Sequence, residues 1–138
     1  MKRYGADYVV NAKEKSWSKK VLKFTEDEGV DEILEFVSRT KTVEEDIKSL
    51  RNGGRLVLVA YSDSVPLKIN SYKVVLNELD IIGTHGPDKE DVEKCVELIV
   101  EGKLKPVITK TFPLEEVNQA MSILKEGKLS GRITLKVS

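Results

Sequence analysis

The sequence predicts an α/β fold in which crossover helices join the strands of a parallel sheet. Over residues 1–84, short apolar runs that suit strands alternate with segments of helical periodicity. The apolar residues of those runs are consecutive rather than alternating, which is typical of strands that are buried on both faces, as parallel strands are. At 138 residues, the chain has the length of one domain or of a large piece of one.

The first elements follow in order from the N-terminus. The apolar run within 7–11 predicts a buried strand, and a helix that Ser16 could cap comes next. Three apolar residues of that helix fall at positions i, i+4 and i+7, on one face: Trp17, Val21 and Phe24. Residues 30–37 predict the second strand.

The second helix is predicted to begin at Thr42, because Thr42 and Glu45 have the spacing of a capping box. The run Asn52-Gly53-Gly54 is expected to end it, since glycine adopts the left-handed conformation common at helix C-termini. The remaining elements of this part are a strand, a short helix and a strand, at 55–60, 71–79 and 80–84.

After residue 86 the pattern changes to longer amphipathic segments. A helix that Asp88 caps is followed by a strand, a second helix and an alternating strand, at 107–112, 113–127 and 131–137. The first of these helices is expected to turn four residues inward: Val92, Cys95, Val96 and Ile99.

The bulk composition excludes several classes of partner. Lys and Arg number 23, as do Asp and Glu, so no basic excess favours nucleic acid. The longest apolar runs are about five residues, far shorter than a membrane span. Cys95 is alone, which excludes an internal disulfide and a cysteine zinc cluster. We therefore expect a cytoplasmic protein with no nucleic-acid or membrane partner.

Ligands of open parallel sheets bind at the carboxyl ends of the strands. Those ends are Val37-Ser38-Arg39, Val59-Ala60-Tyr61-Ser62 and Gly83-Thr84-His85-Gly86. Arg39 is either a phosphate or ribose ligand or an ordinary surface arginine, and the pattern alone favours the second. His85 is the single histidine and has no cysteine or histidine near it in sequence, so it predicts no zinc site.

Two kinds of chemistry have no motif in this sequence. The glycine-rich phosphate loop G-x-G-x-x-G is missing, since Gly53-Gly54 leads into a strand rather than from a strand into a helix. No Ser-His-Asp set and no paired carboxylates stand out. The residues therefore predict no catalytic residue and no metal ligand.

A family resemblance nevertheless runs along the whole chain. The segments "YGADYVVNA", "VDEILEFVSR", "NGGRLVLVAYS" and "ELDIIGT", and then residues 101–137, resemble in order the C-terminal part of a zinc-type, medium-chain alcohol dehydrogenase. The resemblance implies an incomplete Rossmann-like parallel sheet that lacks its first two strands. It makes 1–138 a truncated NAD(P)-binding domain, in which 103–138 is the return segment to a missing catalytic domain.

The resemblance also implies a cofactor, NAD or NADP, and we expect weak binding. It does not indicate which of the two is bound. Zinc belongs to the family, but its ligands have no counterpart in this sequence. The cofactor-facing positions that it implies lie at the three strand ends and on the last strand. They are Phe36, Val37, Ser38 and Arg39 for the adenosine side, Val59, Ala60, Tyr61, Thr84, His85 and Gly86 for the nicotinamide carboxamide, and Arg132 for a phosphate.

Three functional hypotheses follow. The chain is a remnant of a coenzyme domain without activity, an enzyme subunit completed in trans by a complementary chain, or a non-catalytic module that binds full-length homologues. The resemblance implies a homodimer through the strand at 79–84. We also expect the strands at 7–11 and 30–37 to lie side by side, which would leave one sheet face bare until something covers it.

Overall fold

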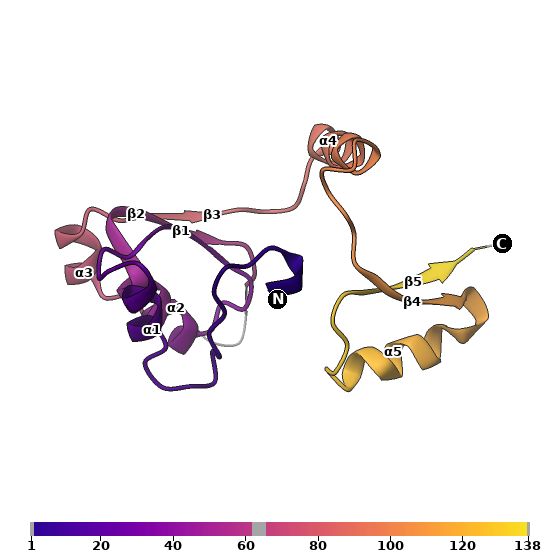
Figure 1. The fold of residues 1–138 in the computed structure, drawn as a ribbon, viewed down its shortest axis with the longest axis horizontal. Helices are drawn as coiled ribbons and strands as arrows, with labels where there is room; N and C mark the ends of the chain where they lie inside the picture. Colours follow the sequence, from indigo (N-terminus) through magenta and orange to yellow (C-terminus); the bar gives the residue numbers. More distant parts are fainter. Residues whose placement is uncertain (1, 62–65, 138) are drawn as a thin grey trace. The chain divides into compact units, whose positions relative to one another are not determined.

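The computed structural model describes residues 2–61 and 66–137, and these residues form two compact units. The first unit is Met1–Gly86 and the second is Pro87–Ser138 (Figure 1). The predicted return segment, 103–138, lies within the second unit.

The first unit is a three-stranded parallel sheet with helices between the strands. Its strands lie in the order β1-β2-β3, which is their order along the chain. The bounds are η1 (Lys2–Tyr4), α1 (Ser18–Phe24), β1 (Val30–Glu35), α2 (Thr40–Ser49), β2 (Leu50–Leu58), α3 (Ser71–Leu76) and β3 (Asp80–Gly83). The predicted α/β class and the parallel strands are confirmed.

The core of this unit lies between one face of the sheet and its helices, with α1 and α2 on the same side (Figure 1). Ile33, Leu56 and Ile81 are register partners across the three strands and point into this core. The helix α2 contributes Val43 and Ile47, which are both buried. Each fully buried aliphatic side chain of this kind contributes about 1.5–3 kcal/mol, so α2 is fixed firmly on the strands.

The opposite face of the sheet carries two rows of side chains. In the first row Arg55 pairs with Glu32 at 4.0 Å and with Asp80 at 3.1 Å. The second row consists of the register partners Leu34, Val57 and Ile82. Leu34 is 56% exposed and Ile82 is 43% exposed, so this row is an uncovered apolar stripe.

The predicted first strand is wrong. Residues 7–11 form no strand, and no described strand lies beside β1 on the side away from β2. A strand persists only where a neighbour takes up its backbone hydrogen bonds. The segment is instead anchored by Tyr8, whose ring stacks on Phe24 with centroids 4.2 Å apart.

Three helix boundaries also differ from the prediction. The residue before α1 is Trp17, not Ser16, which has a positive φ of 54°. The carbonyl of Ser16, rather than its hydroxyl, accepts from the Lys19 amide at 3.1 Å. The helix α2 begins at Thr40, and Thr42 stands in its first turn, where its hydroxyl accepts from the Arg39 amide at 3.2 Å. The helix α2 ends at Ser49, and the glycines at 53 and 54 lie within β2, where the register with β1 is irregular and Gly53 has a positive φ of 68°.

The second unit contains a parallel β-α-β arrangement and a separate helix. Its elements are α4 (Lys89–Val100), β4 (Ile108–Pro113), η2 (Leu114–Glu116), α5 (Val117–Lys125) and β5 (Arg132–Lys136). The strands β4 and β5 pair with each other, and Ala120 of α5 is buried. Asp88 caps α4 as predicted, since its carboxylate accepts from the Asp91 amide at 2.9 Å.

The apolar face of α4 is not inward, contrary to the prediction. Cys95 is exposed, as are the other three residues: Val92, Val96 and Ile99. An amphipathic pattern shows which face of a helix favours burial, but it does not supply the element that covers it. Within residues 2–61 and 66–137, no helix combines the length and the apolar character that a membrane crossing requires.

Candidate functional site

A hollow of about 300 Å³ lies where the three parallel strands of the first unit end. It forms because β1, β2 and β3 all run in one direction and stop at the same edge of the sheet. The residues that line it carry small, apolar or hydroxyl side chains and no charge. They are Ser38, Leu58, Val59, Ala60, Tyr61, Pro66, Leu67, Gly83 and Thr84.

The structure brings five of the predicted cofactor-facing residues together in this lining: Ser38, Val59, Ala60, Tyr61 and Thr84. Phe36, Val37 and Arg39 lie in the turn between β1 and α2 and are not part of the lining. His85 and Gly86 follow β3 outside the lining, and Arg132 is the first residue of β5 in the second unit. Ser62 lies outside the described residues.

The turn that ends β1 is held by side-chain hydrogen bonds. The carboxylate of Glu35 accepts from the Val37 amide and, at 2.9 Å, from the Ser38 amide. Ser38 has a positive φ of 50°, and its hydroxyl donates to the Ala60 carbonyl at 2.5 Å. The Ser38 side chain is therefore committed to joining the ends of β1 and β2 and so shapes one wall of the hollow.

The backbone beneath the hollow is also bonded internally. The amides of Val59 and Ala60 both donate to the Glu35 carbonyl, at 3.0 and 3.2 Å, and the Thr84 amide donates to the Leu58 carbonyl at 3.1 Å. Tyr61 is 88% exposed. The backbone beneath the hollow is thus bonded internally, and the lining carries no charged side chain.

Two buried carboxyl groups support this turn from below, and the sequence analysis missed them. Glu35 ends β1 and is 5% exposed, while Asp46 lies on α2 and is 4% exposed. Burial raises the pKa of Asp46 to about 8, and its hydrogen bond to Glu35 and the charges of Glu35 and Glu45 add to this effect. Burial also opposes ionisation of Glu35, but hydrogen bonds from Asp46 and from the Ser38 and Val37 amides outweigh it and hold that pKa below its usual value.

A signal for this pair was present in the helical periodicity. Asp46 follows Val43 by three residues and immediately precedes Ile47, so it stands on the apolar stripe of α2. A carboxyl group at such a position is rarely buried without a partner. Its partner comes from a strand eleven residues earlier, and sequence spacing alone does not indicate that contact.

A third buried carboxylate ties two helices together rather than supporting the hollow. Glu45 accepts from the Ser18 amide at 3.1 Å and from the Ser18 hydroxyl at 2.8 Å. Lys48 donates to its other oxygen at 2.7 Å. Burial opposes ionisation of Glu45, but the bonds from Lys48 and Ser18 prevail and lower its pKa. This group fastens the start of α1 to α2.

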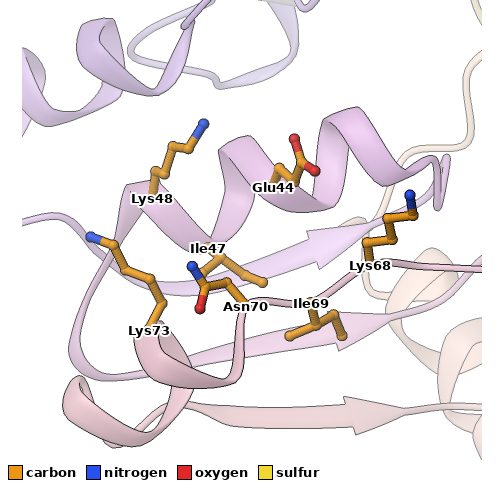
Figure 2. Close-up of a pocket in the computed structure, with 7 residues that line it drawn as sticks. All are labelled: Glu44, Ile47, Lys48, Lys68, Ile69, Asn70 and Lys73. Carbon is orange, nitrogen blue, oxygen red and sulfur yellow. The ribbon is translucent and has the colours of Figure 1, made fainter.

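A second hollow, of about 330 Å³, lies between α2 and α3 (Figure 2). Its lining residues are Glu44, Ile47, Lys48, Lys68, Ile69, Asn70 and Lys73. Figure 2 shows that the ammonium groups of the three lysines end at separate points of the rim rather than converging on one spot. Lys48 is already paired with Glu45. None of the predicted site residues lies here, and the arrangement offers no focused charge for an anion.

The described residues offer no ligand set for a metal ion. Within 2–61 and 66–137, no three His, Cys, Asp or Glu side chains lie close enough together to hold one.

Comparison with known proteins gives consistent matches. The model of a family described as zinc-binding dehydrogenase matches residues 1–101. A curated NAD-dependent alcohol dehydrogenase of Saccharolobus solfataricus is 34% identical over 134 residues, covering 97% of this chain and 38% of that protein. The corresponding enzyme of Sulfolobus acidocaldarius is 37% identical over 139 residues, with 97% and 38% covered. This chain therefore spans less than two fifths of the length of these relatives.

Solved structures give the same result. A crystal structure of an NAD-dependent alcohol dehydrogenase aligns with a TM-score of 0.82 and 29% identity, covering 99% of this chain and 40% of that chain. The alcohol dehydrogenase of the archaeon Aeropyrum pernix aligns with a TM-score of 0.83 and 28% identity, covering 96% and 37%. The strand order β1-β2-β3 and the β4–β5 pair thus occur within larger solved proteins.

Proposed function

Because the chain belongs to the zinc-binding dehydrogenase family, as the C-terminal coenzyme-domain portion of an alcohol dehydrogenase, we propose that it holds the nicotinamide end of an NAD(P) site. The hollow at the strand ends is that site. The observation that carries the proposal is its neutral lining, in which Ala60, Tyr61 and Thr84 from two strand ends meet. Relatives named as NAD-dependent alcohol dehydrogenases support the choice of ligand.

The adenosine side of the cofactor is proposed to lie along the turn that ends β1, at Phe36 and Arg39. Arg39 is the last residue of that turn and directly precedes α2. Its guanidinium is a cation that can donate hydrogen bonds to a ribose or phosphate oxygen. The hollow and the turn have no feature that separates NAD from NADP.

Binding by this chain is expected to be weak. The sequence contains no G-x-G-x-x-G loop, so the backbone amides and helix N-terminus that hold a pyrophosphate in dinucleotide folds are not supplied. Each charge-assisted hydrogen bond of that kind contributes about 1.5–3 kcal/mol. The loss of several moves the dissociation constant by three or more decades, to roughly millimolar.

Hydride transfer is not proposed for this chain by itself. The catalytic zinc of the family does not fit the residues described here, since they contain no ligand set for it. No step of an alcohol oxidation is therefore assigned to any residue of this chain. The activity of a complete alcohol dehydrogenase is proposed only for an assembly in which another chain or another part of the protein supplies the zinc site.

Completion in trans by a complementary chain is a second candidate, and one observation favours it. The apolar stripe of Leu34, Val57 and Ile82 is uncovered in the first unit, and the outer edge of β1 pairs with no described strand. A strand added at this edge would extend the sheet, and its helix would cover the stripe. Covering apolar surface contributes about 25 cal/mol per Å², so a fitting chain would gain affinity from both features.

The proposed site is tested by titrating nicotinamide mononucleotide into the ¹⁵N-labelled chain and following amide chemical shifts. We expect saturable shifts of Ala60, Tyr61 and Thr84 at millimolar concentration. Tyr61→Ala should weaken them several-fold, while the matched control Tyr72→Ala, on exposed α3, should not. Shifts confined to the hollow beside Ile69, or none at tens of millimolar, would refute the assignment.

A further inference from the structure

The buried carboxyl groups of Glu35 and Asp46 have an arrangement that two ionised carboxylates do not tolerate. They come from different elements, β1 and α2, and are hydrogen-bonded to each other. One oxygen of Asp46, Oδ2, is buried and finds no N–H or O–H donor among the described residues. Two acceptors can form a hydrogen bond only when one of them carries a proton, so the pair holds one proton between its members.

The surroundings decide which member carries the proton. Glu35 accepts from two backbone amides, those of Val37 and Ser38, and these bonds favour its ionised form. The Oδ2 atom of Asp46 has no such donor among the described residues, and the further charged group that acts on Asp46 is Glu45 of its own helix, another carboxylate. Lys48 of α2 and Ser18 of α1 both bond to Glu45 and not to Asp46. The proton therefore resides on Asp46, and Glu35 is the carboxylate.

We propose that Asp46 is a positioning residue, which donates its carboxyl proton to Glu35 and thereby holds the turn of residues 36–39 beside the site at the strand ends. The connection has four links. Asp46 donates to Glu35, Glu35 accepts from the Val37 and Ser38 amides, and the Ser38 hydroxyl donates to the Ala60 carbonyl at 2.5 Å. The effect of this turn on ligand binding rests on the proposed function, whereas the chain of hydrogen bonds from Asp46 to Ala60 does not.

The proton makes this connection dependent on pH. The pKa of Asp46 in the fold is about 8, well above its ordinary value of 3.8. Between these two values the folded chain binds a proton that the unfolded chain has released, so stability decreases as pH rises and levels off above pH 8. Glu35 and Glu45, whose pKa values are lowered, act in the opposite direction, but only at pH values near and below 4.5. Among the described residues, the decrease above pH 5 is therefore assigned to Asp46.

The test uses the full chain and three variants. Asp46→Asn keeps a donor for Glu35 but carries no proton that can be lost, and Asp46→Ala removes the donor. Glu44→Gln is the matched control, since it removes a carboxylate from the exposed face of the same helix. Amide hydrogen exchange at Val37 and Ser38, and the unfolding equilibrium constant in urea, are measured between pH 5 and pH 9 without any cofactor.

We expect the unfolding constant of the parent chain and of Glu44→Gln to rise with pH, by up to about tenfold per pH unit, and to level off near pH 8. Exchange at Val37 and Ser38 should gain an extra acceleration over the same range, beyond the intrinsic rate. Asp46→Asn should remove both pH dependences and keep the amides protected, and Asp46→Ala should leave them unprotected at every pH. A parent chain without the pH dependence, an Asp46→Asn variant that retains it, or amides that stay protected in Asp46→Ala would each overturn the proposal.

Discussion

Ser38 provides the most quantitative test of how the candidate site is built. Its hydroxyl bond to the Ala60 carbonyl and its positive φ of 50° oppose each other, because the bond stabilises the turn while the backbone conformation costs energy. A net hydrogen bond contributes about 0.5–1.5 kcal/mol. A non-glycine residue in the left-handed region costs about 1–2 kcal/mol. Substitution by alanine and by glycine separates the two terms.

Ser38→Ala loses the bond and keeps the backbone cost, so the free energy of unfolding should fall by about 0.5–1.5 kcal/mol. Ser38→Gly loses the same bond, but glycine adopts a positive φ without strain. Unfolded glycine has a larger chain entropy, which offsets part of this gain, so the free energy of unfolding should be about 1 kcal/mol higher for Ser38→Gly than for Ser38→Ala. Glycine should therefore be the milder substitution. The assay is urea unfolding followed by the fluorescence of Trp17, the single tryptophan, which lies in the same unit. A glycine variant no more stable than the alanine variant, or an alanine variant equal to the parent, would refute this reasoning.

Three further predictions follow from other parts of the chain. Gly131→Ala should destabilise the β4–β5 pair by more than 1 kcal/mol, because φ is +114° and a Cβ would stand 2.6 Å from the Val107 carbonyl oxygen; unchanged amide protection in β5 would contradict this. Gly83→Pro should abolish a homodimer formed through β3, because the Thr84 amide donates to Leu58 of β2 and the preceding Gly83 amide therefore faces the free edge, where proline removes the donor; light scattering that shows the parent's mass for the variant excludes this interface. The pure chain should oxidise no simple alcohol with NAD or NADP, with or without added zinc; cofactor reduction above a denatured control would disprove it.

The sequence predicted the parallel sheet well because its information is local. Consecutive apolar residues within 55–60 and 80–84 favour strands of a parallel sheet, and β2 and β3 overlap these runs, although one face of the sheet is uncovered rather than buried. The spacing of Thr42 and Glu45 likewise predicted a helix in the segment that forms α2. The carboxyl ends of the strands then converged by topology alone, which is why Ser38, Ala60 and Thr84 meet in one hollow.

The failures concern contacts with elements that the local pattern does not contain. The run at 7–11 has strand character, but no described strand pairs with it. Cys95 lies on the apolar face of α4 and is exposed, because a helix does not itself supply the element that covers its apolar face. The pairing of Glu35 with Asp46 joins a strand to a helix, so neither a strand period nor a helix period indicates it. In each case the local sequence pattern indicated correctly that a segment or side chain favours a contact, but it did not indicate which element makes that contact or whether one is present.

The central claim is that this chain binds the nicotinamide end of a dinucleotide and lacks the means to hold its pyrophosphate. Isothermal calorimetry with nicotinamide mononucleotide and with NAD, on the same protein, tests it most directly. The account predicts roughly millimolar dissociation constants for both ligands that differ by less than about tenfold, or 1.4 kcal/mol. A micromolar constant for NAD, three decades tighter than for the mononucleotide, would contradict it.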